Sequence, residues 1–367
     1  MEKIVTKFIT IFILIGTLVV MMTTNIIVPS KEFSYSERRK LAQFPEIKFS
    51  EIVSGDFFED MEKYLLDQFV FRDFFRKVDS FLRLKMLNQK EVKGVYVIGD
   101  GLYKMEYPLS EKSVINISQK IEKIIQEYLQ ANDIYYAIIP DKNYFVAEKN
   151  GYLALDYQKI QNIMQENITN AKYINLFETL EIGDYYRTDI HWRQDKIIDA
   201  VNEIFKGFDD DYSVSLEDYA INKLSPFYGT YYGQSPIKIA ADELMFLTNE
   251  VINQALVYNF YTSKYVGVYD ESKINNVDGY DVYLEGAVPL LTIENPLCDN
   301  GEELYIFRDS FGSSIAPLFI ERYSKIHLID LRYASIELIS EYLDFQAGQK
   351  VLFLYSSTII NNSFTFK

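Results

Sequence analysis

Residues 303–314 read ELYIFRDSFGSS, a short apolar run that ends in a polar turn and leads into a helical pattern. The runs IYYAIIP (134–140), KIHLIDL (325–331) and KVLFLYS (350–356) have the same strand-like character. Segments with helical periodicity separate them. Because alternation of strands and helices favours parallel pairing, we predict a three-layer α/β fold built on a mainly parallel sheet.

Ser310 lies directly after the strand-like run 303–307 and just before a glycine and a helical pattern. Ligands of open α/β sheets bind beyond the carboxyl ends of the strands, so a serine here would face a binding site. Gly312 would allow close backbone approach, and the helix N-terminus would offer N–H groups to an oxyanion. The alternative is that Asp309 or Ser310 only caps the helix.

The segment TDIHW (188–192) supplies a candidate base. Asp189 and His191 are two residues apart, a spacing that puts both side chains on one face only if the segment is extended. The carboxylate would then fix the imidazole tautomer and stabilise its charged form. The alternative is a helix-capping aspartate beside a structural histidine. The other histidine, His327, lies within a strand-like run, where we favour a structural role. Trp192, the only tryptophan, could pack as core, stack on a sugar ring or support His191, and we favour support.

The N-terminal region contains a membrane-span candidate. Residues 8–28 form a run of 21 residues without a charged side chain, enough to cross a hydrocarbon core of about 30 Å as a helix. Lys3 and Lys7 precede the run and favour a cytoplasmic tail at 1–7. A cleaved signal peptide is the alternative, but no small-residue cleavage pattern stands out. We therefore predict a single-pass cell-membrane protein with its main domain outside the cytoplasm.

Composition excludes several classes of function. The 367 residues carry a net charge of -16, which repels phosphate backbones, so we expect no nucleic-acid partner. The single cysteine, Cys298, rules out an intramolecular disulfide. No cluster of histidines and cysteines has the spacing of a zinc site, so we expect neither a metal nor another cofactor.

The chain divides into segments that differ in composition and in predicted secondary structure. Residues 29–90 are predicted to form a linker and membrane-proximal helices, and 91–367 an α/β domain. Within that domain, 208–300 is rich in Tyr, Asp, Asn and Gly and contains short β-like runs, which indicates a β-rich insertion. Asp141 and Lys142 follow a strand-like run and could line a cleft, but we expect them to pair with each other in solvent.

The order and spacing of the motifs resemble those of the DHHW family, which is related to the SGNH-hydrolase-like O-acetyltransferases of bacterial exopolysaccharide systems, such as the alginate acetylation proteins. The resemblance covers nearly the entire chain. Its motifs are RRKLAQFP (38–45), KYLLDQFVFR (63–72), VIGDGLYKM (97–105), IIPDKNYF (138–145), TDIHW (188–192), PFYGTYYGQS (226–235), NP (295–296) leading into IFRDSFGSS (306–314), and LIDLRY (328–333).

This resemblance implies that residues 91–367 form an SGNH-hydrolase-like domain, and it implies roles for individual residues. Ser310 matches the nucleophile, His191 the base and Asp189 the residue that orients the base. Arg332 and Tyr333 match an Asp-x-Arg-Tyr segment near the site. The implied enzyme is an extracytoplasmic serine O-acyltransferase that acetylates a cell-surface polysaccharide, with an integral-membrane acyltransferase as the acyl donor.

The chain departs from the family pattern at two positions. Ile190 stands where the family's name motif has a second histidine, and isoleucine can neither titrate nor bind a metal. Arg308 stands where SGNH esterases carry glycine in Gly-Asp-Ser. A carbohydrate esterase with the same triad is the alternative enzyme, and a non-catalytic cell-envelope scaffold is the alternative from another class.

Overall fold

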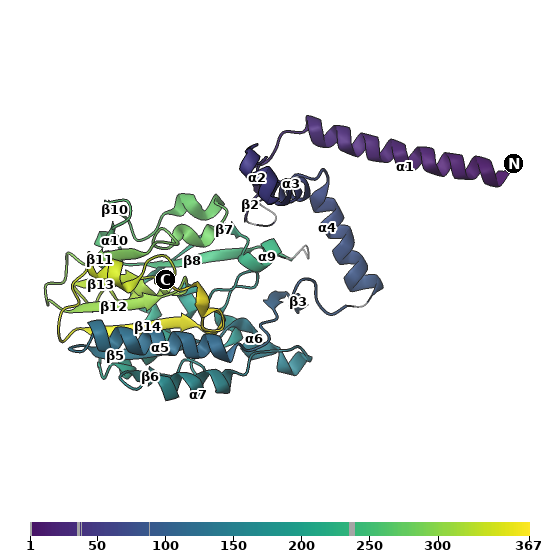
Figure 1. The fold of residues 1–367 in the computed structure, drawn as a ribbon. Coiled ribbons are helices and arrows are strands. Elements are labelled where there is room, and N and C mark those ends of the chain that lie inside the picture. The colour runs from purple at the N-terminus through teal and green to yellow at the C-terminus, as the bar shows by residue number, and fades with distance from the viewer. Residues whose placement is uncertain (1, 35–36, 38, 88, 235–238) are drawn as a thin grey trace. The chain divides into compact units, whose positions relative to one another are not determined.

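The computed structural model describes residues 2–34, 37, 39–87, 89–234 and 239–367 (Figure 1). The chain separates into two compact units. The first comprises residues 1–93 and 232–238, and the second comprises 94–231 and 239–367.

The first unit begins with a long apolar helix. Its helices are α1 (Glu2–Ile27), α2 (Phe49–Ser54), α3 (Asp56–Asp67) and α4 (Arg72–Phe81), the last continued by a π-helical turn (Leu82–Met86), and strands β1 (Phe33–Ser34) and β2 (Arg39–Lys40) pair antiparallel. Within α1, the segment Val5–Ile27 has a mean hydropathy of 2.3 and is not buried, so it is long and apolar enough to cross a membrane.

The second unit is built on an eight-stranded sheet with the order β10-β9-β11-β13-β12-β14-β5-β6. The strands are β5 (Asp133–Ile139), β6 (Lys172–Ile174), β9 (Leu256–Asn259), β10 (Lys264–Val266), β11 (Leu290–Glu294), β12 (Glu303–Arg308), β13 (Lys325–Ile329) and β14 (Lys350–Ser356). From β13 to β6 all neighbours pair parallel, which confirms the predicted, mostly parallel sheet. Strands β9, β10 and β11 extend it by antiparallel pairing.

Further helices and strands complete the chain. They are the hairpin β3 (Val95–Ile98) with β4 (Gly101–Lys104), the pair β7 (Ala220–Phe227) with β8 (Asp242–Thr248), and helices α5 (Glu111–Tyr128), α6 (Lys142–Val146), α7 (Tyr157–Asn167), α8 (Ile198–Gly207), α9 (Thr230–Gln234), α10 (Glu250–Gln254), α11 (Gly312–Ile315), α12 (Ile336–Ser340) and α13 (Ser357–Ile360). The helix predicted after Ser310 is only one α-helical turn followed by a 3₁₀ turn, Ala316–Phe319. Pro317 lacks the N–H that would continue the α-helical hydrogen bonding.

Both faces of the main sheet are buried. Along β12, Leu304 and Ile306 belong to one hydrophobic cluster, which includes side chains of α8. The alternate residues Tyr305 and Phe307 belong to another, which includes side chains of α5 and α7. Strands buried on both faces read as continuous apolar runs, which is why these segments stand out in the sequence.

Candidate active site

Three side chains from two distant segments meet at the carboxyl end of β12. The Nε2 atom of His191 lies 2.7 Å from Oγ of Ser310, and Nδ1 lies 2.5 Å from Oδ1 of Asp189. The aspartate is fully buried, the histidine is nearly so, and the serine is half-buried. This is the geometry in which a carboxylate fixes the imidazole with its proton on Nδ1, leaving Nε2 free to accept the serine proton.

The carboxylate of Asp189 is held by more than the imidazole. Its Oδ1 also accepts the backbone N–H of His191 at 2.9 Å, and its Oδ2 accepts the N–H of Thr230 at 2.6 Å. Hydrogen bonds to the ionised form of a carboxyl group favour that form. The charged aspartate that the imidazole needs is therefore stabilised by the backbone.

The segment that carries Asp189 and His191 is a tight loop rather than a helix. Tyr185 and Trp192 form an isolated antiparallel bridge at its base, and the N–H of Tyr186 donates to the carbonyl of His191 at 3.1 Å. The Tyr185 hydroxyl donates to the carbonyl of Pro140 at the end of β5, at 2.6 Å. The loop is thus fixed to the same sheet edge as Ser310.

Lys142 is the main internal support of this loop. Its Nζ lies 2.7 Å from the carbonyl oxygens of Leu102 and Tyr186 and 3.1 Å from those of Arg187 and Asp189. Burial lowers the pKa of Lys142 to about 7. The expectation that Lys142 pairs with its neighbour in solvent is wrong, because the side chain is 1% exposed and bonds to backbone oxygens.

Asp141 is buried separately and bonds to other groups. It accepts from the hydroxyls of Ser357 and Tyr157 at 2.6 and 2.9 Å, and from the N–H of Asn143 at 2.8 Å. Burial raises the pKa of this carboxyl above its ordinary value, and the hydrogen bonds act in the opposite direction. Asp141 and Lys142, which follow β5, therefore bind neighbouring segments at this sheet edge through buried hydrogen bonds.

Gly229 allows the chain to approach Asp189 closely. A Cβ atom at this glycine would lie 2.3 to 2.4 Å from atoms of Asp189, and its N–H donates to the hydroxyl of Thr188 at 2.9 Å. The next residue is Thr230, whose N–H reaches the carboxylate. The sequence gives this glycine no individual role, although it lies within the motif PFYGTYYGQS (226–235).

The turn that carries Ser310 is fixed by Asp309. Its carboxylate accepts the N–H of Phe311 at 3.0 Å and both the N–H and hydroxyl of Ser356, at 2.8 and 2.7 Å, at the end of the adjacent β14. A Cβ at Gly312 would lie 2.5 Å from Cβ of Arg308, so this position needs glycine. Among the described contacts, the Ser310 N–H has no acceptor, so it is available to an oxyanion.

Aromatic rings hold the imidazole. Tyr280 stacks on His191 with ring centroids 3.8 Å apart and planes 9° apart, and Phe311 packs at 4.8 Å. The Tyr280 hydroxyl and the Trp192 indole N–H both donate to the hydroxyl of Ser314, at 2.7 and 2.8 Å. Trp192 is fully buried and therefore does not face a sugar. Its contacts fit the support role.

Arg332 and Tyr333 lie at the end of β13, the strand next to β12. The Arg332 guanidinium donates to both carboxylate oxygens of Asp330, at 2.9 and 2.6 Å, and lies over the ring of Tyr333, which is 48% exposed. Asp330 is also 3.7 Å from Nη1 of the buried Arg308. Burial lowers the pKa of Arg308 below its ordinary value.

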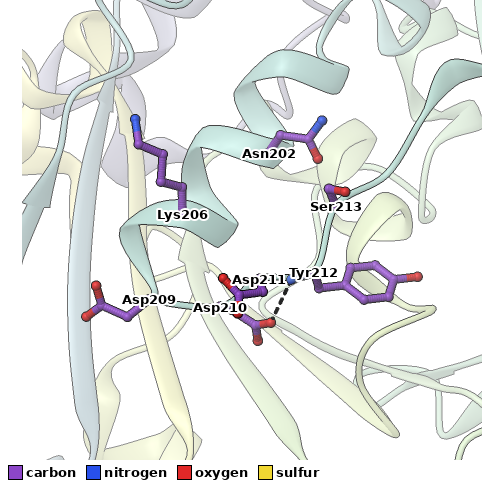
Figure 2. Close-up of a pocket in the computed structure, with 7 residues that line it drawn as sticks. All are labelled: Asn202, Lys206, Asp209, Asp210, Asp211, Tyr212 and Ser213. Atoms are coloured by element: carbon purple, nitrogen blue, oxygen red, sulfur yellow. Dashed lines mark hydrogen bonds between the residues drawn. The ribbon is translucent and has the colours of Figure 1, made fainter.

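Two other features lie apart from these groups. His327 bonds to Thr292 and Glu303 at 2.9 and 3.0 Å within the sheet, which agrees with a structural role. Figure 2 shows a pocket at the end of α8 that is lined by Asn202, Lys206 and residues 209–213. It contains none of the three residues that meet at Ser310, so we assign it no part in their chemistry.

Comparison with known proteins gives the fold. No protein-family model matches the chain, and no curated protein matches it. A DHHW family protein from Eubacterium siraeum DSM 15702 superimposes with a TM-score of 0.61 and 19% identity, covering 74% of this chain and 93% of that one. PatB1 from Bacillus cereus gives 0.57 and 19%, covering 72% and 96%. The same protein with a sulfonyl adduct gives 0.57 and 17%, covering 72% and 97%. The solved structures that share this fold thus include a DHHW family protein, in agreement with the resemblance of the motifs.

Proposed function

We propose that the protein is an extracytoplasmic serine O-acyltransferase in which Ser310, His191 and Asp189 form the catalytic triad. The observation that carries the proposal is the continuous chain of hydrogen bonds from Asp189 through His191 to Ser310, at 2.5 and 2.7 Å. The resemblance to the DHHW family supports the same assignment. The three-layer arrangement of an SGNH-hydrolase-like domain is part of this proposal.

In the first half of the reaction, Ser310 takes the acyl group. Its Oγ attacks the carbonyl carbon of an acyl donor while Nε2 of His191 accepts the hydroxyl proton. Asp189 stabilises the resulting imidazolium, and the Ser310 N–H donates to the oxyanion. The bond to the leaving group then breaks, and His191 returns the proton to it. The product of this half is an ester on Ser310.

In the second half, a sugar hydroxyl replaces the donor. His191 accepts the proton of that hydroxyl as its oxygen attacks the ester carbonyl, and the proton returns to Oγ of Ser310 when the bond breaks. If water attacks instead, the same steps hydrolyse the ester. The two reactions therefore use the same residues and differ in the acceptor that reaches the ester.

The proposed acceptor is a cell-surface polysaccharide, and the proposed acyl group is acetyl. The resemblance to the exopolysaccharide O-acetyltransferases supports both, and implies that an integral-membrane acyltransferase supplies the acetyl group. The apolar segment Val5–Ile27 supports a membrane anchor that would keep the enzyme beside such a donor.

The proposal is tested with the full chain in detergent and an activated acetyl ester, with and without an oligosaccharide acceptor. We expect acetylated sugar to form only when the active protein is present. Ser310→Ala should abolish its formation. Ser313→Ala, three residues further along, is the matched control and should leave the activity nearly unchanged. Fast hydrolysis without transfer would assign an esterase, and no reaction with any ester would favour a non-catalytic scaffold.

A further inference from the structure

Helices α3 and α4 of the first unit carry apolar side chains on their outer surface. The exposed side chains are Phe58, Leu65, Leu66, Phe69, Phe71, Phe74, Phe75, Val78, Phe81 and Leu82, with exposed fractions between 36% and 65%. Along α4 they recur three or four residues apart, so they form one stripe on the helix. We call these ten residues the aromatic stripe.

Two arginines on the polar face of α4 are turned toward the protein instead. Arg72 and Arg76 reach Glu37, and only 23% and 17% of their side chains are exposed. Phe74 and Phe81 on the other face are each 60% exposed. A surface helix of a water-soluble domain has the reverse arrangement. An apolar surface of this size therefore indicates a non-aqueous environment or a binding partner.

Hydrogen bonds tie the stripe to the end of the apolar helix. The side-chain oxygen of Asn25, in the last turn of α1, accepts the N–H of Val70 at 2.7 Å. Gln68 and the backbone of Lys31 exchange two hydrogen bonds of 2.9 Å. The turn between α3 and α4 therefore lies at the C-terminal end of α1 (Figure 1). In a membrane-spanning α1 this level is the membrane–water interface, where aromatic side chains are favoured.

The basic residues lie in α4 and the segment after it, whereas α3 (Asp56–Asp67) contains five acidic residues and one lysine. Residues 72–93 contain seven lysines and arginines and three acidic residues, a net charge of +4, whereas the whole chain carries -16. Basic residues in and after a helix that presents phenylalanines on its apolar face are typical of segments that lie in a membrane interface with anionic lipids.

We propose that the aromatic stripe lies in the interfacial layer of a bilayer that contains anionic lipids, and so forms a second membrane attachment beside α1. The exposed apolar face of α4, the hydrogen bonds of the preceding turn to the end of α1 and the positive charge of residues 72–93 carry this inference. It rests on α1 as a membrane anchor and is independent of the chemistry at Ser310.

The test uses the full chain in vesicles of phosphatidylcholine and phosphatidylglycerol. Trp192 is fully buried, so quenchers reach it little and its fluorescence is a constant background to the tryptophan added by Phe74→Trp. Lipids brominated on their acyl chains should quench the added fluorescence at least twofold. Replacing phosphatidylglycerol by phosphatidylcholine should weaken that quenching. Phe81→Trp provides a second position if the first variant folds poorly.

Asp79→Trp is the matched control, since Asp79 lies on the other face of α4 and is half-exposed. Its fluorescence should be quenched by aqueous acrylamide and much less by brominated lipids. Equal lipid quenching at positions 74 and 79 would overturn the proposal. So would fluorescence at position 74 that only acrylamide quenches, or that neither reagent quenches, because the stripe would then face water or protein. Equal lipid quenching with and without phosphatidylglycerol would overturn the selectivity for anionic lipids.

Discussion

Replacing Lys142 by methionine tests how the loop that carries Asp189 is held in place. The ammonium group has three hydrogens and four backbone carbonyls within 2.7 to 3.1 Å. Methionine has a similar length but no hydrogen-bond donor. The carbonyl of Arg187 would still accept a hydrogen bond from the N–H of Leu102, at 2.8 Å. Those of Leu102 and Tyr186 have no second donor among the described contacts and would become unsatisfied.

Each buried carbonyl left without a donor costs about 1–3 kcal/mol, so the gross loss for the carbonyls of Leu102 and Tyr186 is about 2–6 kcal/mol. Removing a buried charge offsets part of this loss. We therefore expect Lys142→Met to lower the free energy of unfolding by about 2 kcal/mol. We also expect kcat to fall about 100-fold, since a shift of about 1 Å in a group that positions the base has that effect.

The assay is acetyl-ester turnover by the full chain, measured well below the melting temperature so that the variant is folded. A second readout is the rate at which a sulfonyl fluoride modifies Ser310, which requires no acceptor. Lys104→Met is the matched control, because Lys104 lies on the β3–β4 hairpin but bonds to none of the four carbonyls. A folded Lys142→Met variant with wild-type rates in both assays would refute the positioning role, even if its stability fell.

Three further predictions concern Asp189, Gly229 and Glu106. Asp189→Asn should lower kcat about 10³- to 10⁴-fold with little change in circular dichroism, because an amide cannot accept from both the imidazole and the N–H of Thr230; a loss below tenfold would argue against the triad. Gly229→Ala should lower kcat about 100-fold, since its Cβ would meet Asp189, whereas Gly267→Ala, where a Cβ has room, should not; equal rates in turnover assays would contradict the close approach. Burial raises the pKa of Glu106 from 4.5 to about 7. Its contribution to stability is therefore present below about pH 4.5 and lost as the pH rises through 7, in total about 3 kcal/mol at 1.36 kcal/mol per pH unit. Glu106→Gln should accordingly gain stability relative to wild type between pH 5 and pH 8 in urea unfolding, and a constant difference would count against this assignment.

The sequence predicts the parts of the site that depend on local pattern. A serine after a buried strand must lie at the carboxyl edge of a parallel sheet, and Asp-x-His brings two side chains together wherever the chain is extended. The sequence does not predict where β9, β10 and β11 pair. Their short apolar runs do not show that they join the main sheet by antiparallel pairing.

The supports of the site could not be predicted in this way, because their partners are distant in the chain. Lys142 bonds to carbonyls between 40 and 47 residues away, and a neighbouring aspartate suggested a simple surface pair. Gly229 and Tyr280 reach the Asp189–His191 loop only in the folded chain. Side chains that bind backbone carbonyls, and glycines that allow close approach, leave no periodic signal in the sequence.

The most direct measurement is mass spectrometry of the protein after brief exposure to an activated acetyl ester without acceptor. The account predicts one acetyl group on the peptide that contains Ser310, its removal when an oligosaccharide is added, and its absence in Ser310→Ala and in His191→Ala. An acetyl group on another residue, or turnover without any acetylated Ser310, would contradict it.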